Sequence, residues 1–514
     1  MRRIAATIGL TVTATVLAAC GGGGGGGGKG GDAQVVDGGT FTMALSSDPG
    51  NLDPQSSVLS ALISISQLSY DHLTNIDPKT GEIQSGLASE WNVDGTTVTA
   101  TLGEGITCSD GSELTATDVA DNLNYIADPK NENQLLGTFL PAGAKTTADD
   151  ASRTVTITLA APAPFVLEGL ASVPIICAKG LADRASLAKT SDGTGPYELT
   201  EAATGNQYTY TIRDGYTWGP GGATTATKGM PDTIVMKIIE NESTASNLLL
   251  SGELNGAVIN GSDKKRLDAS GLTTSDTPTL AGEQWFNQAA GRPAEDPKVR
   301  MALAQALDFG ELQKVLTSGD GTGGTTFAAL APVACTGDSI SKAMPKQDVA
   351  AAKAVLSDLP ELTMVYSAAG NGVSAAVELA VEQWKAAGVT VKAKSQSATA
   401  IQETVFGSSN WDIAWIALNV NSPDQLVPFL SGPGSPEGTN FAGIKNETYE
   451  AGVAKASTMT GQEGCSTWLD AESALVKEAD VIPFANTVGK AYRAKSTFDY
   501  PGQMAPTSIR MLAN

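Results

Sequence analysis

The sequence contains a single histidine, His72, among 514 residues. A metal site built from several imidazoles is therefore excluded, and so is the zinc-protease motif that needs two histidines on one helix. A serine–histidine–aspartate triad would have to use His72, and no nucleophile motif accompanies it. Aromatic residues make up only 5% of the chain, so a surface that stacks on sugars or bases would depend on few side chains.

Positive charge is scarce as well. The chain has 33 lysines and arginines against 55 aspartates and glutamates, which gives a formal net charge of −22. Phosphate binding needs clustered lysine and arginine, so this balance argues against nucleic acid as a partner. Hydrophobic residues make up 41% of the chain, as in ordinary folded proteins, and the length is ample for large buried cores.

Long apolar segments are lacking beyond the N-terminus. Ile4–Ala19 is apolar or small but is too short to span a bilayer as a helix, so we interpret residues 1–19 as a signal peptide. The segment ends Leu17-Ala18-Ala19-Cys20, which is typical of a bacterial lipobox, so Cys20 is predicted to carry acyl chains. The glycine-rich residues 20–37 would then be a flexible tether. A plain signal peptide followed by a chance cysteine is the alternative.

Four cysteines remain after Cys20, and four cysteines allow three disulfide connectivities. Disulfides persist outside the cytoplasm, which agrees with the predicted export. A zinc site is the alternative, but the sequence has no CxxC pair and no second histidine, so no metal is predicted.

Strands and helices alternate along the chain, which predicts an α/β protein. Alternating or β-branched patterns predict strands at 40–45, 96–102, 153–159, 208–213, 234–239, 361–367 and 389–394. Apolar stripes predict helices at 60–70, 114–126 and 373–387 and a further helix that starts at Asp296-Pro297. Residues 361–394 therefore form a predicted β-α-β unit.

No catalytic or cofactor motif stands out. GxSxG, HExxH and Walker A sequences are absent, so we predict no catalytic residues, no enzyme activity and no cofactor. A pair of catalytic carboxylates cannot be recognised from spacing, and a secreted hydrolase therefore stays open as an alternative.

Several segments, in order, resemble the family 5 extracellular solute-binding proteins of ABC importers, the group that binds dipeptides and oligopeptides. The most specific is Ser109–Val119, similar to that family's "sDG.pltA.DV" pattern. The others are Asp48-Pro49 with Leu52-Asp53-Pro54, then Leu87–Trp91, Gly193–Tyr197, Asp296–Asp308 and Val481–Phe484. Together they extend over nearly the whole chain that follows the tether.

The resemblance implies a two-lobed, periplasmic-binding-protein-like (type II) α/β fold that closes around a ligand. Lobe one would comprise 38–59, 190–283 and 485–514, with a subdomain inserted at 60–189, and lobe two would comprise 284–484. The chain would cross the hinge near Gly282-Glu283 and near Phe484-Ala485. This division favours the disulfides Cys108–Cys177 and Cys335–Cys465, because each pair then lies within one subdomain.

The resemblance also directs attention to two segments beside the predicted cleft. After the first crossing, Trp285 and Asn287 could face the cleft or belong to the core. Later, Trp415 precedes a stretch in which peptide-binding members carry a carboxylate that pairs with the ligand's ammonium group. Here Asn421 or Asn419 occupies that place, and Asp424 follows three residues after Asn421. An amide cannot neutralise a buried ammonium, so the sequence departs from the peptide-binding pattern.

The predicted function is a lipid-anchored substrate-binding protein of an ABC importer, located at the outer face of the cytoplasmic membrane or in the periplasm. It would act as a monomer, capture a small solute such as a short peptide, and deliver it to a membrane permease. Its alternatives are a non-peptide solute, such as a sugar or metal chelate, and the secreted hydrolase.

Overall fold

The computed structural model describes residues 34–331, 333–368, 372–434, 437–459 and 461–513. The chain divides into two units, residues 1–34 and 35–514, and the second unit is described here. The predicted signal peptide, Cys20 and most of the predicted tether lie outside the described residues. The tether is shorter than expected at its end, because Val35 and Val36 form strand β1.

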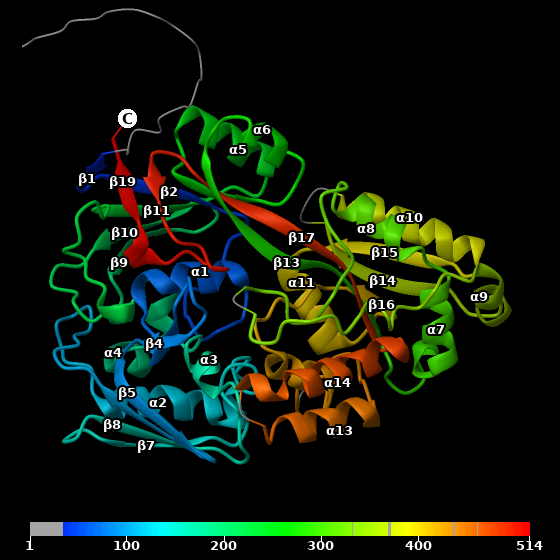
Figure 1. Cartoon of the computed structure of the whole chain (residues 1–514), viewed down its shortest axis with the longest axis horizontal. Helices are drawn as coiled ribbons and strands as arrows, with labels where there is room; N and C mark the ends of the chain where they lie inside the picture. The colour runs from blue at the N-terminus through cyan, green and yellow to red at the C-terminus, as the bar shows by residue number, and fades with distance from the viewer. Residues whose placement is uncertain (1–33, 332, 369–371, 435–436, 460, 514) are drawn as a thin grey trace, which may run out of the picture. The chain divides into compact units, whose positions relative to one another are not determined.

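Ten strands form the largest sheet of the described chain, and β13 and β17 lie at its middle (Figure 1). In spatial order they are β15 (Val391–Gln396), β14 (Leu362–Ser367), β16 (Ile413–Trp415), β13 (Thr273–Phe286), β17 (Val481–Arg493), β12 (Gly256–Ile259), β2 (Thr40–Leu45), β11 (Thr233–Ile238), β10 (Gln207–Ile212) and β9 (Tyr197–Ala203). We call the part built on β2 and β9–β12 lobe one and the part built on β14–β16 lobe two.

Fourteen α-helices accompany these strands in the described residues. They are α1 (Ser60–Ser69), α2 (Ala116–Ala127), α3 (Val166–Leu170), α4 (Ala178–Ala182), α5 (Glu242–Ser251), α6 (Lys264–Asp268), α7 (Pro297–Gln305), α8 (Phe309–Leu316), α9 (Val349–Leu356), α10 (Val373–Ala386), α11 (Ala398–Gln402), α12 (Val427–Leu430), α13 (Glu447–Ala456) and α14 (Cys465–Lys477). None of them is long and apolar enough to cross a membrane.

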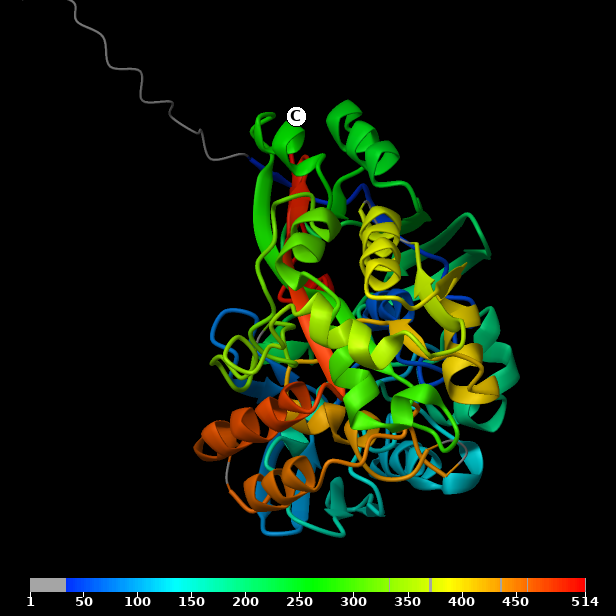
Figure 2. The same cartoon turned by 90° about the vertical axis from the view of Figure 1, so that its right-hand side faces the viewer.

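Strands β13 and β17 run antiparallel to each other through both lobes (Figures 1 and 2). We call them the hinge strands, because they contain the two predicted crossings between the lobes. Their pairing shifts register between Leu280 and Glu283, at the predicted first crossing. Gly282 is required there, because a Cβ atom would lie 2.6 Å from the Phe484 ring and 2.7 Å from Leu316. A larger side chain would force the two strands and α8 apart.

A separate antiparallel sheet forms the inserted subdomain, in the order β5 (Ala88–Asp94), β6 (Thr97–Leu102), β8 (Thr154–Thr158) and β7 (Lys145–Asp149). Helix α2 packs on it and starts with a capping box, in which Thr115 and Asp118 each bond the other's backbone N–H. The apolar core of this subdomain extends from Leu73 to Cys177. Helix α1 instead packs with β2 in the lobe-one core, although residue 60 was the predicted start of the insertion.

Two small sheets are also present in the described chain. One has the order β1 (Val35–Val36), β19 (Arg510–Leu512) and β18 (Ser496–Thr497), and it brings the start of the described chain beside its end. The other pairs β3 (Thr74–Ile76) with β4 (Ile83–Ser85).

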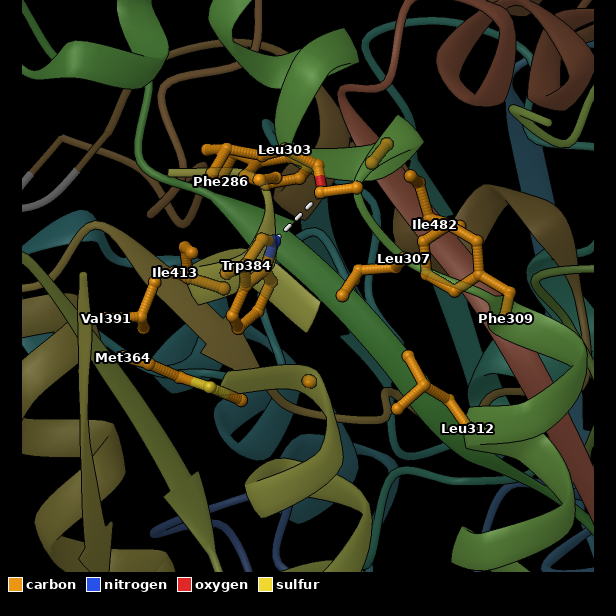
Figure 3. Packing of buried hydrophobic residues seen from close by; sticks show 14 of the residues in the cluster. Phe286, Leu303, Leu307, Phe309, Leu312, Met364, Trp384, Val391, Ile413 and Ile482 are labelled. Carbon is orange, nitrogen blue, oxygen red and sulfur yellow. Dashed lines mark hydrogen bonds between the residues drawn. The ribbon is translucent and has the colours of Figure 1, made fainter. Parts of the chain in front are cut away.

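Lobe two has its own apolar core, in which the predicted β-α-β unit is present. Strands β14 and β15 are parallel and α10 connects them. Figure 3 shows Trp384 of α10 between these strands and α7, with its indole N–H donating to the Leu303 carbonyl at 2.9 Å. Helix α7 starts as predicted, since Asp296 accepts from the Lys298 N–H and Pro297 occupies the first helical position.

Both predicted disulfides are present, Cys108–Cys177 in the inserted subdomain and Cys335–Cys465 in lobe two. The strands and helices expected from the sequence also form, each within a few residues of the predicted bounds.

The motifs that carry the family resemblance are structural in this fold. Gly193 and Gly195 pack against the end of α1, where a Cβ atom would lie 2.3 Å from the Ser69 carbonyl oxygen or 2.5 Å from its carbon. Asp53 forms an ion pair with Arg184, at 2.7 Å, and so joins the early loop to the inserted subdomain. These motifs therefore join parts of lobe one and its inserted subdomain.

Candidate functional site

A cavity of about 1000 Å³ lies between the two lobes. Lobe one contributes α1, the β3–β4 hairpin and the segment 499–508, and lobe two contributes the segment 415–421. The hinge strand β13 contributes Thr277, Thr279, Ala281 and Glu283 to its wall. A cavity of this volume, lined from both lobes, can enclose a small organic solute on several sides. This is the usual form of a ligand site.

The segment after β16 lies along the hinge strand. The Leu418 N–H donates to Glu283 Oε2 at 2.9 Å, and the Ile416 N–H donates to the Glu283 carbonyl at 3.2 Å. The Asn419 amide pairs with both backbone groups of Leu280, at 2.8 and 3.1 Å. The wall formed by lobe two is thus attached to the strand on which the lobes would rotate.

Two predicted site residues do not reach the cavity. Trp285 is fully buried, donates to the Ile416 carbonyl at 2.8 Å and packs against Phe441 in lobe two. Asn287 donates to the Trp411 and Ser409 carbonyls. Trp285 lies on the same strand face as Glu283, but the segment after β16 covers it, so it belongs to the core.

Asp424 also lies outside the cavity wall. It accepts from the Ser422 hydroxyl at 2.5 Å, and burial raises the pKa of its carboxyl to about 6. Burial, together with the Asp424 charge, raises the pKa of Glu168 in the inserted subdomain. Asp424 of lobe two therefore lies near Glu168 of the inserted subdomain and does not line the ligand space.

The three remaining predicted residues line the cavity. Trp415 is 7% exposed, its indole N–H donates to Gln284 Oε1 at 3.0 Å, and its ring packs on Phe484. The amide of Asn419 is used by the hinge strand, as described above. The Asn421 Oδ1 atom has no hydrogen-bond partner in the described chain, so Asn421 is the better candidate for a ligand contact.

Four residues that the sequence analysis missed share this property. Their atoms line the cavity, are buried, and have no partner among the described residues: Thr138 Oγ1, Thr277 Oγ1, Glu283 Oε1 and Gln425 Nε2. A buried polar atom without a partner costs about 1–3 kcal/mol, so such atoms are rare unless something binds them. Glu283 could have been noticed from its position at the predicted crossing, whereas Thr277 and Gln425 leave no signal in the sequence.

The charged side chains of the wall are mainly acidic. They are Asp71, Asp77, Glu242, Glu283 and Asp499, against Lys79 and His72. Lys79 is exposed on a turn, and burial lowers the pKa of His72 to about 4, so His72 is neutral at pH 7. No arginine lines the cavity in the described chain. The wall is therefore poorly suited to a ligand carboxylate.

The lobes also touch outside the hinge. Phe165, at the start of α3 in the inserted subdomain, is 2% exposed and packs with residues of lobe two, among them Cys335, Ala456 and Trp468. The described lobes are thus in contact at the hinge and at Phe165. Among the described residues, no group of three or more histidine, cysteine, aspartate or glutamate side chains could hold a metal ion.

Comparison with known proteins identifies the family. The profile of the bacterial extracellular solute-binding proteins, family 5, matches residues 82–438. The chain belongs to this family. The resemblance seen in the sequence motifs is thereby confirmed.

Among characterised relatives of this family-5 protein, the oligopeptide-binding protein OppA of Bacillus subtilis is 25% identical over 72% of this chain and 73% of its own. The glutathione-binding protein GsiB of Escherichia coli K12 is 28% identical over 57% of this chain, and the match spans 55% of GsiB. The chain thus matches little more than half the length of GsiB.

Solved structures of solute-binding proteins share the whole described fold. A substrate-binding protein from Microbacterium hydrocarbonoxydans, complexed with 4-hydroxybenzoate hydrazide, has a TM-score of 0.81 and 28% identity, over 92% of this chain and 99% of that one. A dipeptide-binding protein from Pseudoalteromonas sp. SM9913, with Met-Leu, has a TM-score of 0.77 and 20% identity, over 92% and 100%. The predicted two-lobed α/β fold is confirmed.

Proposed function

We propose that this chain is the lipid-anchored substrate-binding protein of an ABC importer, which captures a small solute between its lobes and delivers it to a membrane permease. It would work as a monomer outside the cytoplasm and break no bond of the solute. The observation that carries the proposal is the cavity between the lobes, whose wall contains five buried polar atoms without partners in the described chain. Such atoms gain hydrogen bonds when a solute enters.

Two classes of ligand are candidates. A short peptide is supported by the similarity to OppA, which is named for oligopeptide binding. A small non-peptide solute is supported by the hydrazide bound to the Microbacterium hydrocarbonoxydans protein. The absence of arginine from the described cavity wall favours the second class, because a peptide carboxylate would find no buried cation.

Recovery of the natural solute tests the function. Native mass spectrometry of protein purified from its own source is expected to reveal a bound small molecule. After removal and re-addition, this solute should stabilise the protein, by about 2.7 kcal/mol at 100-fold excess over Kd. Tryptophan fluorescence should change as well, because Trp415 lines the cavity.

The solute should also be recovered with its mass unchanged. Stabilisation by no small molecule would contradict solute binding, and conversion of the solute into a product would favour the hydrolase.

The contact at Phe165 gives a prediction about closure. Replacing Phe165 with alanine should weaken binding of the recovered solute by about tenfold or more. Truncation of a buried phenylalanine costs about 3–5 kcal/mol in cores, and only the state in which the lobes touch bears this loss. Affinity can be measured by titration calorimetry.

The exposed Leu250 on α5 offers a control, since Leu250→Ala removes apolar atoms that are already 42% exposed and do not line the cavity. Its affinity should equal that of the wild type. Equal affinities of Phe165→Ala and Leu250→Ala would show that this contact does not contribute to closure.

A further inference from the structure

Glu283 is a carboxylate placed where a solute would lie. It is 1% exposed, belongs to the hinge strand β13 and lines the cavity. Its Oε2 accepts from the Leu418 N–H at 2.9 Å, while Oε1 has no partner in the described chain. One half of the carboxylate is therefore fixed in position and the other half is available.

Among the residues that the structure describes, none supplies a counter-ion for this carboxylate. Burial raises the pKa of Glu283 to about 8, opposed chiefly by the uncharged Leu418 N–H and by no cation. The charged groups elsewhere on the wall are the carboxylates, the exposed Lys79 and the neutral His72 described above. A buried carboxylate without a cation is costly, and a cation from outside would relieve that cost.

The other carboxylates of the wall are either hydrogen-bonded or partly exposed. Asp71 accepts from the Tyr216 and Trp218 side chains and from the Thr194 hydroxyl. Glu242 accepts from two backbone N–H groups of the 260–261 segment, and Asp77 from those of residues 79 and 80. Asp77 and Asp499 are only partly buried, so water can reach their carboxylates, whereas Glu283 is buried and keeps one oxygen without a partner.

The polar atoms of the wall that have no partner suit a ligand group that donates hydrogen bonds. Four of them are oxygens and one is the nitrogen of Gln425. The hydroxyls of Thr138 and Thr277 can accept or donate, whereas the free oxygens of Glu283 and Asn421 are the groups that suit a donor. A protonated amine has N–H donors and no acceptor, whereas a carboxylate has only acceptors. The composition of the wall therefore favours a cationic nitrogen over an anion.

We propose that Glu283 binds a positively charged nitrogen of the solute, and that the solute class is small organic cations, amines without a free carboxylate. This deepens the proposed function and rests on it. Glu283 would supply from the hinge strand the negative charge that Asn421 lacks. Because the hinge strand belongs to both lobes, the charge pair would form where the lobes rotate.

A matched series of probes tests the assignment. Alanyl-phenylalanine amide carries one positive charge, alanyl-phenylalanine is a zwitterion, and the N-acetylated amide is neutral. We expect the cationic amide to bind wild type most tightly in calorimetry at pH 7. Glu283→Gln should weaken it by about 30-fold or more and leave the neutral probe within about threefold, because only the charge pair is lost.

Proton release gives a second readout, which a structural role for Glu283 would not produce. A cation binds the ionised carboxyl, so binding at pH 7 should release roughly one proton, and affinity should rise from pH 6 to pH 8. Calorimetry in buffers of different ionisation enthalpy measures this proton. Glu283→Gln should abolish the release.

Glu472→Gln is the matched control. Glu472 is an equally buried carboxyl of lobe two that accepts from the Ser339 hydroxyl at 2.5 Å and does not line the cavity. This variant should bind the cationic probe as the wild type does. If Glu283→Gln fails to fold, Glu283→Asp keeps the charge and should keep the preference for the cation over the neutral probe.

Other results overturn the assignment. These are tighter binding of the zwitterion or of the neutral probe by wild type, no binding of the cationic amide, or proton release that persists in Glu283→Gln. If the recovered natural solute still stabilises the protein in those cases, the proposed function stands and only the role of Glu283 fails. If neither the solute nor any probe stabilises it, the proposed function fails too.

Discussion

Replacing Cys20 with alanine is expected to move the protein from the membrane fraction to the soluble fraction. Burial of acyl chains contributes about 0.8 kcal/mol per CH₂, and two or more chains anchor a protein stably where one does not. No helix of the described residues could span a membrane in place of the lipid. With a net charge of −22, the chain also has little electrostatic attraction to anionic headgroups.

Fractionation of a bacterial host under a high-salt wash measures this effect. Lys29→Ala, in the same glycine-rich segment, leaves the predicted lipobox Leu17–Cys20 intact and should stay with the membranes. Retention of Cys20→Ala in the washed pellet would show that something other than acylation holds the protein.

Replacing Arg300 with methionine is expected to destabilise the folded protein by about 3–5 kcal/mol. Arg300 and Asp480 form an ion pair at 2.9 Å, with side chains only 6% and 1% exposed. Arg300 also donates to the carbonyls of Ala294 and Glu295. Without the guanidinium, Asp480 stays buried with only the Gln288 and Asn446 amides as partners.

The loss of stability in Arg300→Met should depend on pH. Burial already raises the pKa of Asp480 despite the nearby guanidinium, and removal of Arg300 would raise it further. A carboxyl whose pKa is higher in the folded state lowers stability above its unfolded pKa, and the penalty grows with pH up to the folded pKa. Arg300→Met should therefore be less destabilising at pH 5 than at pH 7.

Urea-induced unfolding measures both effects. The control is Arg266→Met, since Arg266 pairs with Asp263 on the surface at 3.1 Å and is 44% exposed. Surface pairs contribute about 0–1 kcal/mol, so this variant should unfold close to the wild type. Equal stability losses in the two variants would mean that burial of the Arg300 pair has no special importance.

Local patterns in the sequence predicted the regular elements well. Strand β2 alternates between buried and exposed positions as its sequence does, and α2 and α7 begin at their capping residues. The hinge strands β13 and β17 were recognised only as places where the chain crosses between lobes. Their partners are about 200 residues apart, and such pairing leaves no local periodicity.

In the candidate site, too, the sequence predicted some residues correctly as neighbours of the cavity and not others. The resemblance predicted ligand contacts at Trp415 and Asn421, and both residues line the cavity. Trp285 and Asp424 were not distinguishable from wall residues by sequence, because the segments that cover or surround them come from elsewhere in the chain. Glu283 was visible in the sequence as a hinge residue but not as a carboxylate with a free oxygen.

The sequence by itself determined the family and the α/β class, because these depend on local patterns and motifs, and the lobe division implied by the family resemblance predicted the two disulfides. Only the tertiary structure decided which polar atoms line the cavity without a partner. That property depends on which backbone groups the fold brings to each side chain: Leu280 uses the amide of Asn419, whereas Asn421 and Glu283 each keep an oxygen free. Ligand recognition therefore rests on long-range packing that no segment of the sequence specifies alone.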